Sequence, residues 1–242
     1  MKELRPHPKI KIGASILAAD PLHLEREIQK VQEGGVDLIH VDIMDGHFVP
    51  NLTMGPFVVE GIKKAARVPL DLHLMVEYPS KFIEPFRQVS GKGDYFTFHI
   101  ESKDEPRRVI SQLREAGFRV GISLNPPTQA ERVESALGGL GEVDLLLVMT
   151  VNPGFAGQKF IEGVMPKLRH LRSLSPELDI MVDGGINEET VPIAARHGAN
   201  IMAAAKGIFG KKDPAQAVRD LRHLAQENFL AGSDPATVGG RH

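Results

Sequence analysis

Short apolar segments alternate along the chain with longer amphipathic segments. The short segments are apolar at consecutive positions, which is typical of parallel strands that are buried on both faces. The longer segments repeat their apolar residues at helical spacing. Several of them end at a glycine, such as Gly34, Gly117 and Gly198, and glycine is a common stop signal of helices. The pattern predicts eight strand-then-helix units.

The predicted strands and helices follow one another in strict alternation. The strands are expected at residues 10–16, 38–43, 70–76, 95–100, 119–124, 144–151, 178–184 and 199–205. The helices are expected at residues 22–33, 57–66, 81–89, 105–116, 130–137, 164–173, 188–197 and 215–226. A further short helix is expected to open in the segment 203–210.

This alternation predicts an α/β fold, and eight units in 242 residues favour a single closed (β/α)8 barrel, the TIM barrel. An open, doubly wound parallel sheet is the alternative. No low-complexity linker divides the chain, so we expect one barrel domain over residues 1–230. Residues 231–242 are expected to form a disordered tail.

Composition and charge limit the classes of partner. Hydrophobic residues make up 42% and charged residues 25% of the chain, and the net charge is -2, so neither nucleic acid nor a membrane surface is the expected partner. No apolar run approaches the roughly 20 residues that span a bilayer, and no secretion signal is visible, so we expect a cytoplasmic protein. The chain has no cysteine, so any metal must be held by His, Asp or Glu.

Polar side chains gather near the carboxyl ends of these otherwise apolar strands, where barrel enzymes place their active sites. His40 and Asp42 share one face of their strand, because side chains alternate with period two. The whole set consists of Ser15, His40, Asp42, Asp45, His73, His99, Asn125, Asn152 and Asp183.

Taken singly, these residues have ordinary interpretations. A histidine in a strand is more often a hydrogen-bonded core residue, and an aspartate before two glycines is more often a turn former. Their occurrence together favours a shared site, because two buried carboxylates at one barrel mouth need a cation or a proton. We predict that His40, Asp42, His73 and Asp183 hold one divalent cation, for which zinc, iron, manganese and cobalt are all suitable.

Glycine-bearing loops follow the last three predicted strands, namely "NPGFAGQKF" (152–160), "DGGI" (183–186) and "AAAKGIFG" (203–210). Loops in these positions, together with a helix N-terminus, often bind the phosphate group of a barrel enzyme's substrate. Met44, Met75 and Met149 end three strands. They either pack in the core or form an apolar cover that excludes water from the reacting carbons.

These segments together resemble the ribulose-phosphate 3-epimerase family. The similarity covers roughly residues 12–209 and rests on "SILAAD", "HVDIMDGHFVPN", "DLHLMV", "FHIES", "VMTVNPGFAGQKF" and "VDGGI". It implies a metal-binding (β/α)8 isomerase of the pentose phosphate pathway that interconverts D-ribulose 5-phosphate and D-xylulose 5-phosphate. It also implies a homo-oligomer, because family members are often dimers or hexamers.

The resemblance also implies roles for individual residues. Asp42 and Asp183 would be the acid–base pair on opposite faces of the substrate, and the bound metal would stabilise an enediolate. His40, Asp42, His73 and Asp183 would ligate that metal. The implied substrate-binding residues are Ser15, His73, Met44, Met75, Met149, Gly154, Phe155, Ala156, Gly157, Gly184, Gly185, Ala205 and Lys206.

Two departures from the family pattern leave the substrate open. Ala205-Lys206 stands where the family usually has Gly-Ser, and Ala156 replaces a loop glycine, as in some D-allulose 6-phosphate epimerases. Either Lys206 binds the phosphate through its ammonium group, or the far end of the sugar differs. A phosphate-binding lyase or decarboxylase is an alternative of another class, although "HVDIMD" lacks the lysine of their Asp-x-Lys-x-x-Asp pattern. A catalytically inactive metal- or sugar-binding barrel is a third alternative.

Overall fold

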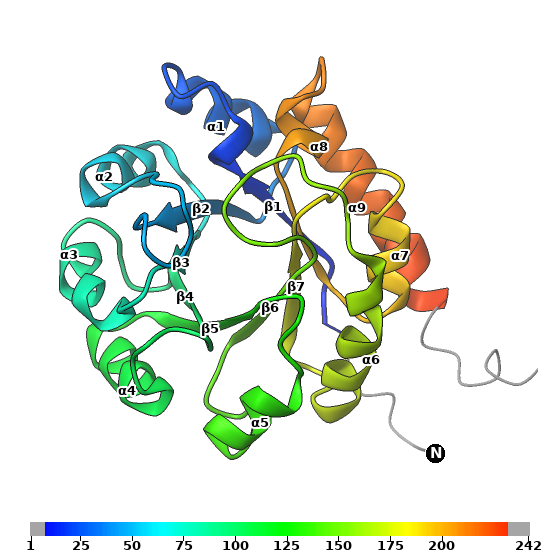
Figure 1. Cartoon of the computed structure of the whole chain (residues 1–242). Helices are drawn as coiled ribbons and strands as arrows, with labels where there is room; N and C mark the ends of the chain where they lie inside the picture. The colour runs from blue at the N-terminus through cyan, green and yellow to red at the C-terminus, as the bar shows by residue number, and fades with distance from the viewer. Residues whose placement is uncertain (1–7, 232–242) are drawn as a thin grey trace, which may run out of the picture.

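The chain folds into a closed barrel of eight parallel strands, each hydrogen-bonded to the next, with β8 pairing back onto β1. The structure is a computed structural model that describes residues 8–231. Helices form an outer ring around the strands (Figure 1). The predicted (β/α)8 barrel is therefore confirmed, and the doubly wound sheet is wrong. Of the tail predicted at 231–242, residue 231 belongs to the last helix and the rest lies outside the described residues.

All eight predicted strands are present, and most differ from their predicted bounds by one or two residues. They are β1 (Lys11–Ser15), β2 (Leu38–Met44), β3 (Leu70–Met75), β4 (Tyr95–His99), β5 (Arg119–Leu124), β6 (Leu145–Met149), β7 (Asp179–Asp183) and β8 (Ile201–Ala204). Most residues of these strands are buried, because the helices cover their outer face and side chains fill the interior.

The helices of the outer ring follow the predicted order. They are α1 (Leu24–Glu33), α2 (Pro56–Ala65), α3 (Ile83–Arg87), α4 (Pro106–Ala116), α5 (Glu131–Leu137), α6 (Met165–Leu174), α7 (Val191–Arg196), the predicted short α8 (Lys206–Phe209) and α9 (Pro214–Ala231). Short 3-10 helices span Ile16–Ala18, Pro79–Phe82 and Glu162–Val164. Among the described residues, none of the helices has both the length and the apolar character needed to cross a bilayer.

Three helices, α1, α3 and α7, begin at least two residues later than predicted, and for α3 and α7 the reason is local. The α-helix α3 starts only at Ile83, after a 3-10 turn, because Pro85 has no N–H to bond the carbonyl of residue 81. Helix α7 starts at Val191 rather than near residue 188. Before it, the side-chain oxygen of Asn187 accepts hydrogen bonds from the backbone N–H groups of Glu189 and Thr190, and this turn replaces the first helical turn.

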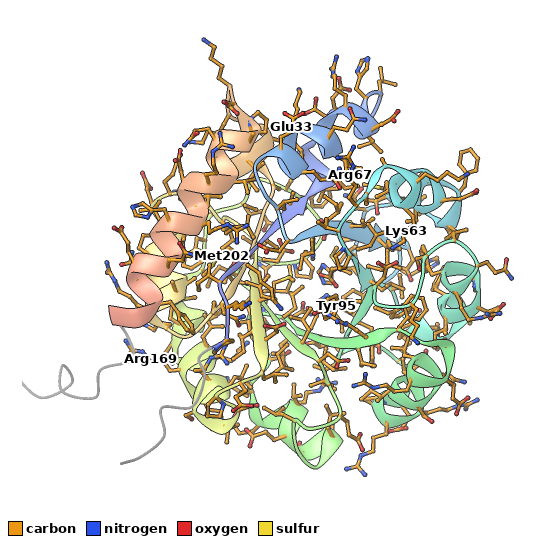
Figure 2. The ribbon with its side chains drawn as sticks, turned by 180° about the vertical axis from the view of Figure 1, so that it is seen from behind. Glu33, Lys63, Arg67, Tyr95, Arg169 and Met202 are labelled. Atoms are coloured by element: carbon orange, nitrogen blue, oxygen red, sulfur yellow. The ribbon has the colours of Figure 1, made fainter. Side chains whose placement is uncertain are left out.

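The interior of the barrel is divided into a polar and an apolar half. Along β2 to β4 the inward positions carry polar side chains, such as His40, Asp71 and Thr97, all fully buried. Along β6 to β8 they are mostly apolar, and side chains such as Leu147 and Met181 form one cluster with Leu38 and Tyr95. Figure 2 shows the barrel from behind, with Tyr95 near its centre. The polar half is where a chemical site is expected.

The outward face of the strands packs against the helices. Phe96 of β4 is fully buried. The centroid of its ring lies 5.5 Å from that of Phe118 and 6.4 Å from that of Phe86, both at edge-on angles.

Replacing Phe96 by alanine should lower the free energy of unfolding by about 3–5 kcal/mol, because it leaves a cavity. Denaturant titration measures this. Phe57→Ala is the control, since Phe57 is 88% exposed, and equal effects of the two changes would contradict the packing described.

Candidate active site

Four side chains with atoms that could coordinate a metal meet at the carboxyl end of the barrel. His40 and Asp42 come from β2, His73 from β3 and Asp183 from β7, and one donor atom of each lies within 4.8 Å of the others. Strand pairing sets this proximity, because Asp42 lies directly beside His73 in the β2–β3 ladder. The structure thus brings together the four residues that the sequence predicts as metal ligands.

The carboxylate of Asp42 lies at the centre of this cluster. Its Oδ1 is 3.0 Å from Nδ1 of His73 and 3.2 Å from Nε2 of His40, and its Oδ2 accepts a 2.8 Å hydrogen bond from the Ser15 hydroxyl. Oδ2 of Asp183 lies 3.7 Å from Nε2 of His40 and 3.9 Å from Nδ1 of His73. Two ring nitrogens and two carboxylates therefore converge, and this donor set suits a divalent transition metal.

A second layer of polar groups holds His40. Its Nδ1 lies 2.7 Å from Oδ2 of Asp71, and the other oxygen of Asp71 accepts a hydrogen bond from the Thr97 hydroxyl. A carboxylate that accepts Nδ1–H leaves the lone pair of Nε2 directed at the cluster. We did not identify Asp71 and Thr97 as site residues from the sequence. The available signal was the period-two alternation, which puts Asp71 on the same face of its strand as His73.

Burial and neighbouring charges move the pKa values of the two carboxylates apart. Burial and the carboxylate of Asp42 raise the pKa of Asp183 to about 7. Burial also acts to raise the pKa of Asp42, but the charges and hydrogen bonds of His40 and His73 outweigh it, so this pKa is lowered. Two carboxyl groups with separated pKa values are what an acid–base pair requires.

The two imidazoles differ as well. Burial lowers the pKa of His73 to about 4, although the hydrogen bond to Asp42 opposes the shift. For His40, burial acts in the same direction, but the charges and hydrogen bonds of Asp42 and Asp71 outweigh it and raise the pKa well above its usual value. These shifts describe the site without a cation, whose charge would favour the neutral ring and the ionised carboxylates.

A cavity of about 410 Å³ opens above the cluster. The carboxyl groups of Asp42 and Asp183 face it, whereas His40 and His73 are fully buried and do not line it. The predicted residues that line it are Ser15, Asp42, Met44, Met75, Met149, Gly154, Phe155, Ala156, Gly157, Asp183, Gly184, Gly185, Ala205 and Lys206. The cavity therefore joins the carboxylates to all three predicted glycine-bearing loops.

These loops use glycine where the backbone requires it. Gly184 and Gly185 have φ values of 111° and 69°, and a Cβ on Gly185 would lie 2.9 Å from the backbone nitrogen of Phe160. The departures at Ala156 and Ala205 cause no such strain, since no described residue other than glycine has a positive φ. The φ of Ala205 is −98°. Losing glycine at these two positions therefore imposes no left-handed backbone on alanine.

Lys206 begins α8 and reaches across the cavity rim to the loop after β6. A Cβ on Gly157 would lie 2.6 Å from its Nζ, so the ammonium group passes directly over this glycine. Lys206 forms no ion pair with another described residue, in contrast to Lys211, which lies 2.7 Å from Glu188. The loop after β6 lies over this end of the barrel (Figure 1), and the Asn51 side chain donates a 2.7 Å hydrogen bond to the carbonyl of Gly154.

Four other polar residues from the predicted set lie away from the cavity wall. The carboxylate of Asp45 accepts hydrogen bonds from the backbone N–H groups of residues 47, 48 and 77 and so shapes the loop after β2. The carbonyl of Asn152 accepts a hydrogen bond from Gln158, and the carbonyl of Asn125 accepts one from Lys167. His99 is fully buried beside His73.

The chain belongs to the ribulose-phosphate 3-epimerase family, whose model matches residues 11–209, and it is therefore an isomerase. A ribulose-phosphate 3-epimerase of Methanocaldococcus jannaschii is 47% identical over 222 residues, covering 90% of this chain and 92% of the relative. The enzyme of Bacillus subtilis is 42% identical, covering 88% and 98%. The cytoplasmic isoform of Oryza sativa subsp. japonica is 44% identical, covering 88% and 92%. The family resemblance seen in the sequence is confirmed.

Solved structures with low sequence identity share the fold. A 3-hexulose-6-phosphate synthase from Salmonella typhimurium has a TM-score of 0.67 at 22% identity, covering 90% of this chain and all of that one. An orotidine 5'-phosphate decarboxylase from Pyrococcus horikoshii has a TM-score of 0.64 at 11% identity, covering 89% and 99%. At these identities the likeness concerns the barrel architecture alone.

The backbone of the loop after β7 generates a prediction. Gly185→Ala should destabilise the protein by about 1–3 kcal/mol, because alanine at a φ of 69° is strained and its Cβ meets the backbone of Phe160. The free energy of unfolding, measured with denaturant, tests this. Gly163→Ala is the matched control, because its Cβ would meet nothing within 4 Å. A Gly185→Ala protein as stable as that control would contradict the constraint.

Proposed function

We propose that this enzyme interconverts D-ribulose 5-phosphate and D-xylulose 5-phosphate by moving a proton at C3. The names of the family and of its relatives support the reaction. The observation that carries the proposal is the placement of Asp42 and Asp183 on one cavity that ends at three glycine-bearing loops. A sugar phosphate with its phosphate at the loops would present its carbonyl end to the carboxylates.

Epimerisation needs one base on each face of the substrate. A proton leaves the carbon next to the ketone, and a second group returns a proton to the opposite face, so the substrate need not turn over. Asp42 and Asp183 fill these roles in the proposal, because both face the cavity from different strands. The lowered pKa of Asp42 and the raised pKa of Asp183 support a pair in which one group is ionised while the other carries a proton.

We propose that His40, Asp42, His73 and Asp183 hold one divalent cation, which is zinc, iron, manganese or cobalt. A cation bound there would supply positive charge that stabilises the negative charge developing on the substrate as its proton leaves. Ser15 keeps the carboxylate of Asp42 in place by its hydrogen bond and lines the same cavity. The convergence of two ring nitrogens and two carboxylates within 4.8 Å supports this site.

The remaining cavity residues bind and shield the substrate in this proposal. Met44, Met75 and Met149 are almost completely buried around the carboxylates and keep water from the reacting carbons. Backbone N–H groups of the loops around Gly157 and Gly185 bind the phosphate, and the ammonium group of Lys206, which pairs with no acid within residues 8–231, adds a full positive charge. His73 does not contact the substrate in this proposal and acts on it only indirectly, as a ligand of the cation.

A 3-epimerase of another ketose phosphate, such as D-allulose 6-phosphate, is the second candidate. The observation that favours it is Lys206, whose side chain lies over Gly157 at the far end of the cavity. Such an enzyme would use the same carboxylates and differ only in where the phosphate lies. The fold shared with decarboxylases does not favour a lyase. Homo-oligomeric assembly and a cytoplasmic location stay predictions.

The two-base mechanism predicts that Asp42→Asn and Asp183→Asn each lower the rate of epimerisation by about 10²–10⁴-fold or more while the barrel still folds. Each variant should still exchange the C3 proton of at most one of the two epimers with deuterated solvent, because one base remains. Asp220→Asn, an exposed change on α9, is the control and should keep the wild-type rate. Turnover near that of the wild type in either site variant would contradict the mechanism.

The phosphate site predicts that Lys206→Ser raises the KM for phosphorylated ketoses by about tenfold and changes kcat little, since it removes binding that is equal in the ground and transition states. Tetrulose, pentulose and hexulose phosphates should be tested beside the free ketoses, with proton exchange as the readout. The substrate with the highest kcat/KM decides between the two candidates. Lys212→Ser is the exposed control, and an unchanged KM for every phosphorylated ketose would remove Lys206 from the site.

A further inference from the structure

A chain of buried and partly buried hydrogen bonds leads from the cluster to the ends of β4 and β5. Nε2 of His73 lies 2.9 Å from Nε2 of His99, and Nδ1 of His99 lies 3.2 Å from Oε2 of Glu101. We propose that His99 and Glu101 are positioning residues, which fix the tautomer and ring orientation of His73 so that its Nδ1 is available to a divalent cation. This inference rests on the metal site of the proposed function.

The direction of donation along this hydrogen-bond chain follows from what each group can donate. An ionised carboxylate only accepts, so Glu101 requires a proton on Nδ1 of His99. A neutral His99 then has a bare Nε2, which accepts the proton on Nε2 of His73. His73 is left with a lone pair on Nδ1, the nitrogen that lies 3.0 Å from Asp42 and 3.9 Å from Asp183. The carboxylate of Glu101 thus selects the metal-binding tautomer of a ring that it does not touch.

Glu101 is itself held in the ionised form and in one place. Its Oε1 accepts a 2.9 Å hydrogen bond from the backbone N–H of Asn125, and the side chain of Thr128 is a further partner. Burial acts to raise the pKa of Glu101, but the hydrogen bonds from His99, Thr128 and Asn125 outweigh it and lower this pKa. A fixed negative charge at the outer end therefore gives the chain a single direction.

Packing shields the hydrogen bonds of His73 and His99 from competing hydrogen-bond partners. His73 and His99 are both fully buried, and their rings are stacked with centroids 5.1 Å apart. The ring of Phe48 lies over His99 at a centroid distance of 4.8 Å. Neither histidine lines the cavity. In the dry interior each imidazole nitrogen must pair with a protein group, so these hydrogen bonds are costly to lose.

The two histidines of the cluster are therefore held in different ways. Nδ1 of His40 meets the carboxylate of Asp71 directly, whereas Nε2 of His73 meets the imidazole of His99, which stands in front of Glu101. A direct carboxylate increases the basicity of a ligand more than a neutral acceptor does. The relay consequently orients His73 without placing a second anion against the two carboxylates.

Metal affinity tests the relay. Zn²⁺ alone is titrated into the full chain in competition with a chromophoric chelator. His99→Leu, which offers no acceptor, should raise the Kd for Zn²⁺ by about 10–100-fold. His99→Gln should restore most of the affinity, because its amide oxygen can accept from His73 while its NH₂ group donates to Glu101. Glu101→Ala should also weaken binding. Glu134→Ala, which removes the Glu134–His170 hydrogen bond on the barrel's outer surface, should leave the Kd unchanged.

Nitrogen-15 spectra of the histidine rings provide the second readout, which a purely structural role would not change. In the Zn²⁺-loaded wild type, His73 should carry its proton on Nε2 and His99 should carry its proton on Nδ1. In Glu101→Ala, His99 should no longer be held to the tautomer with its proton on Nδ1. A folded His99→Leu with wild-type affinity, or a proton on Nδ1 of loaded His73, would overturn the relay. If His99→Leu does not fold, Glu101→Ala and the wild-type spectra decide. A wild type that binds no Zn²⁺ would instead overturn the proposed metal site.

Discussion

The buried carboxylate of Asp42 imposes the main constraint on the polar half of this barrel. A charge that is 3% exposed must be matched by hydrogen-bond donors or by a cation, or the barrel would lose several kcal/mol. The Ser15 hydroxyl donates to it, and ring nitrogens of His40 and His73 lie 3.2 and 3.0 Å away, where they would share a cation with it. Because those imidazoles are buried too, each needs an outer partner of its own. Asp71 and Thr97 satisfy one, and His99 and Glu101 satisfy the other.

The apolar half of the interior is the counterpart of this network. Side chains such as Leu147 and Met181 need no hydrogen-bond partners, so this part of the interior can pack tightly through apolar contacts. Asp183 is the polar residue that this half contributes to the cluster, and it lies in register with Met149 on one side and Ala203 on the other. The loops that follow these strands take the tight glycine conformations that border the cavity, and the backbone of Gly184 hydrogen-bonds the carboxylate of Asp183.

The sequence predicts the barrel and the four central residues because both depend on periodicities within single segments. His40 and Asp42 could be placed on one face from their spacing alone. The contacts of His99 and Asp71 could not, since they depend on the register between strands, which no single segment encodes. For the same reason the path of Lys206 over Gly157 was not predictable. Helix starts were missed where side chains decided them, as Asn187 does before α7.

The pairing of β2 with β3 over six residue pairs limits how this chain can vary through evolution. Deleting one residue of β2 before Asp42 would turn the side chains beyond that point to the other face, so His40 and Asp42 could no longer both point inward. An insertion in a connecting loop leaves that pairing intact. Length changes among related enzymes should therefore accumulate between the strands and helices, and the strand segments themselves should keep a constant number of residues even where their identities diverge.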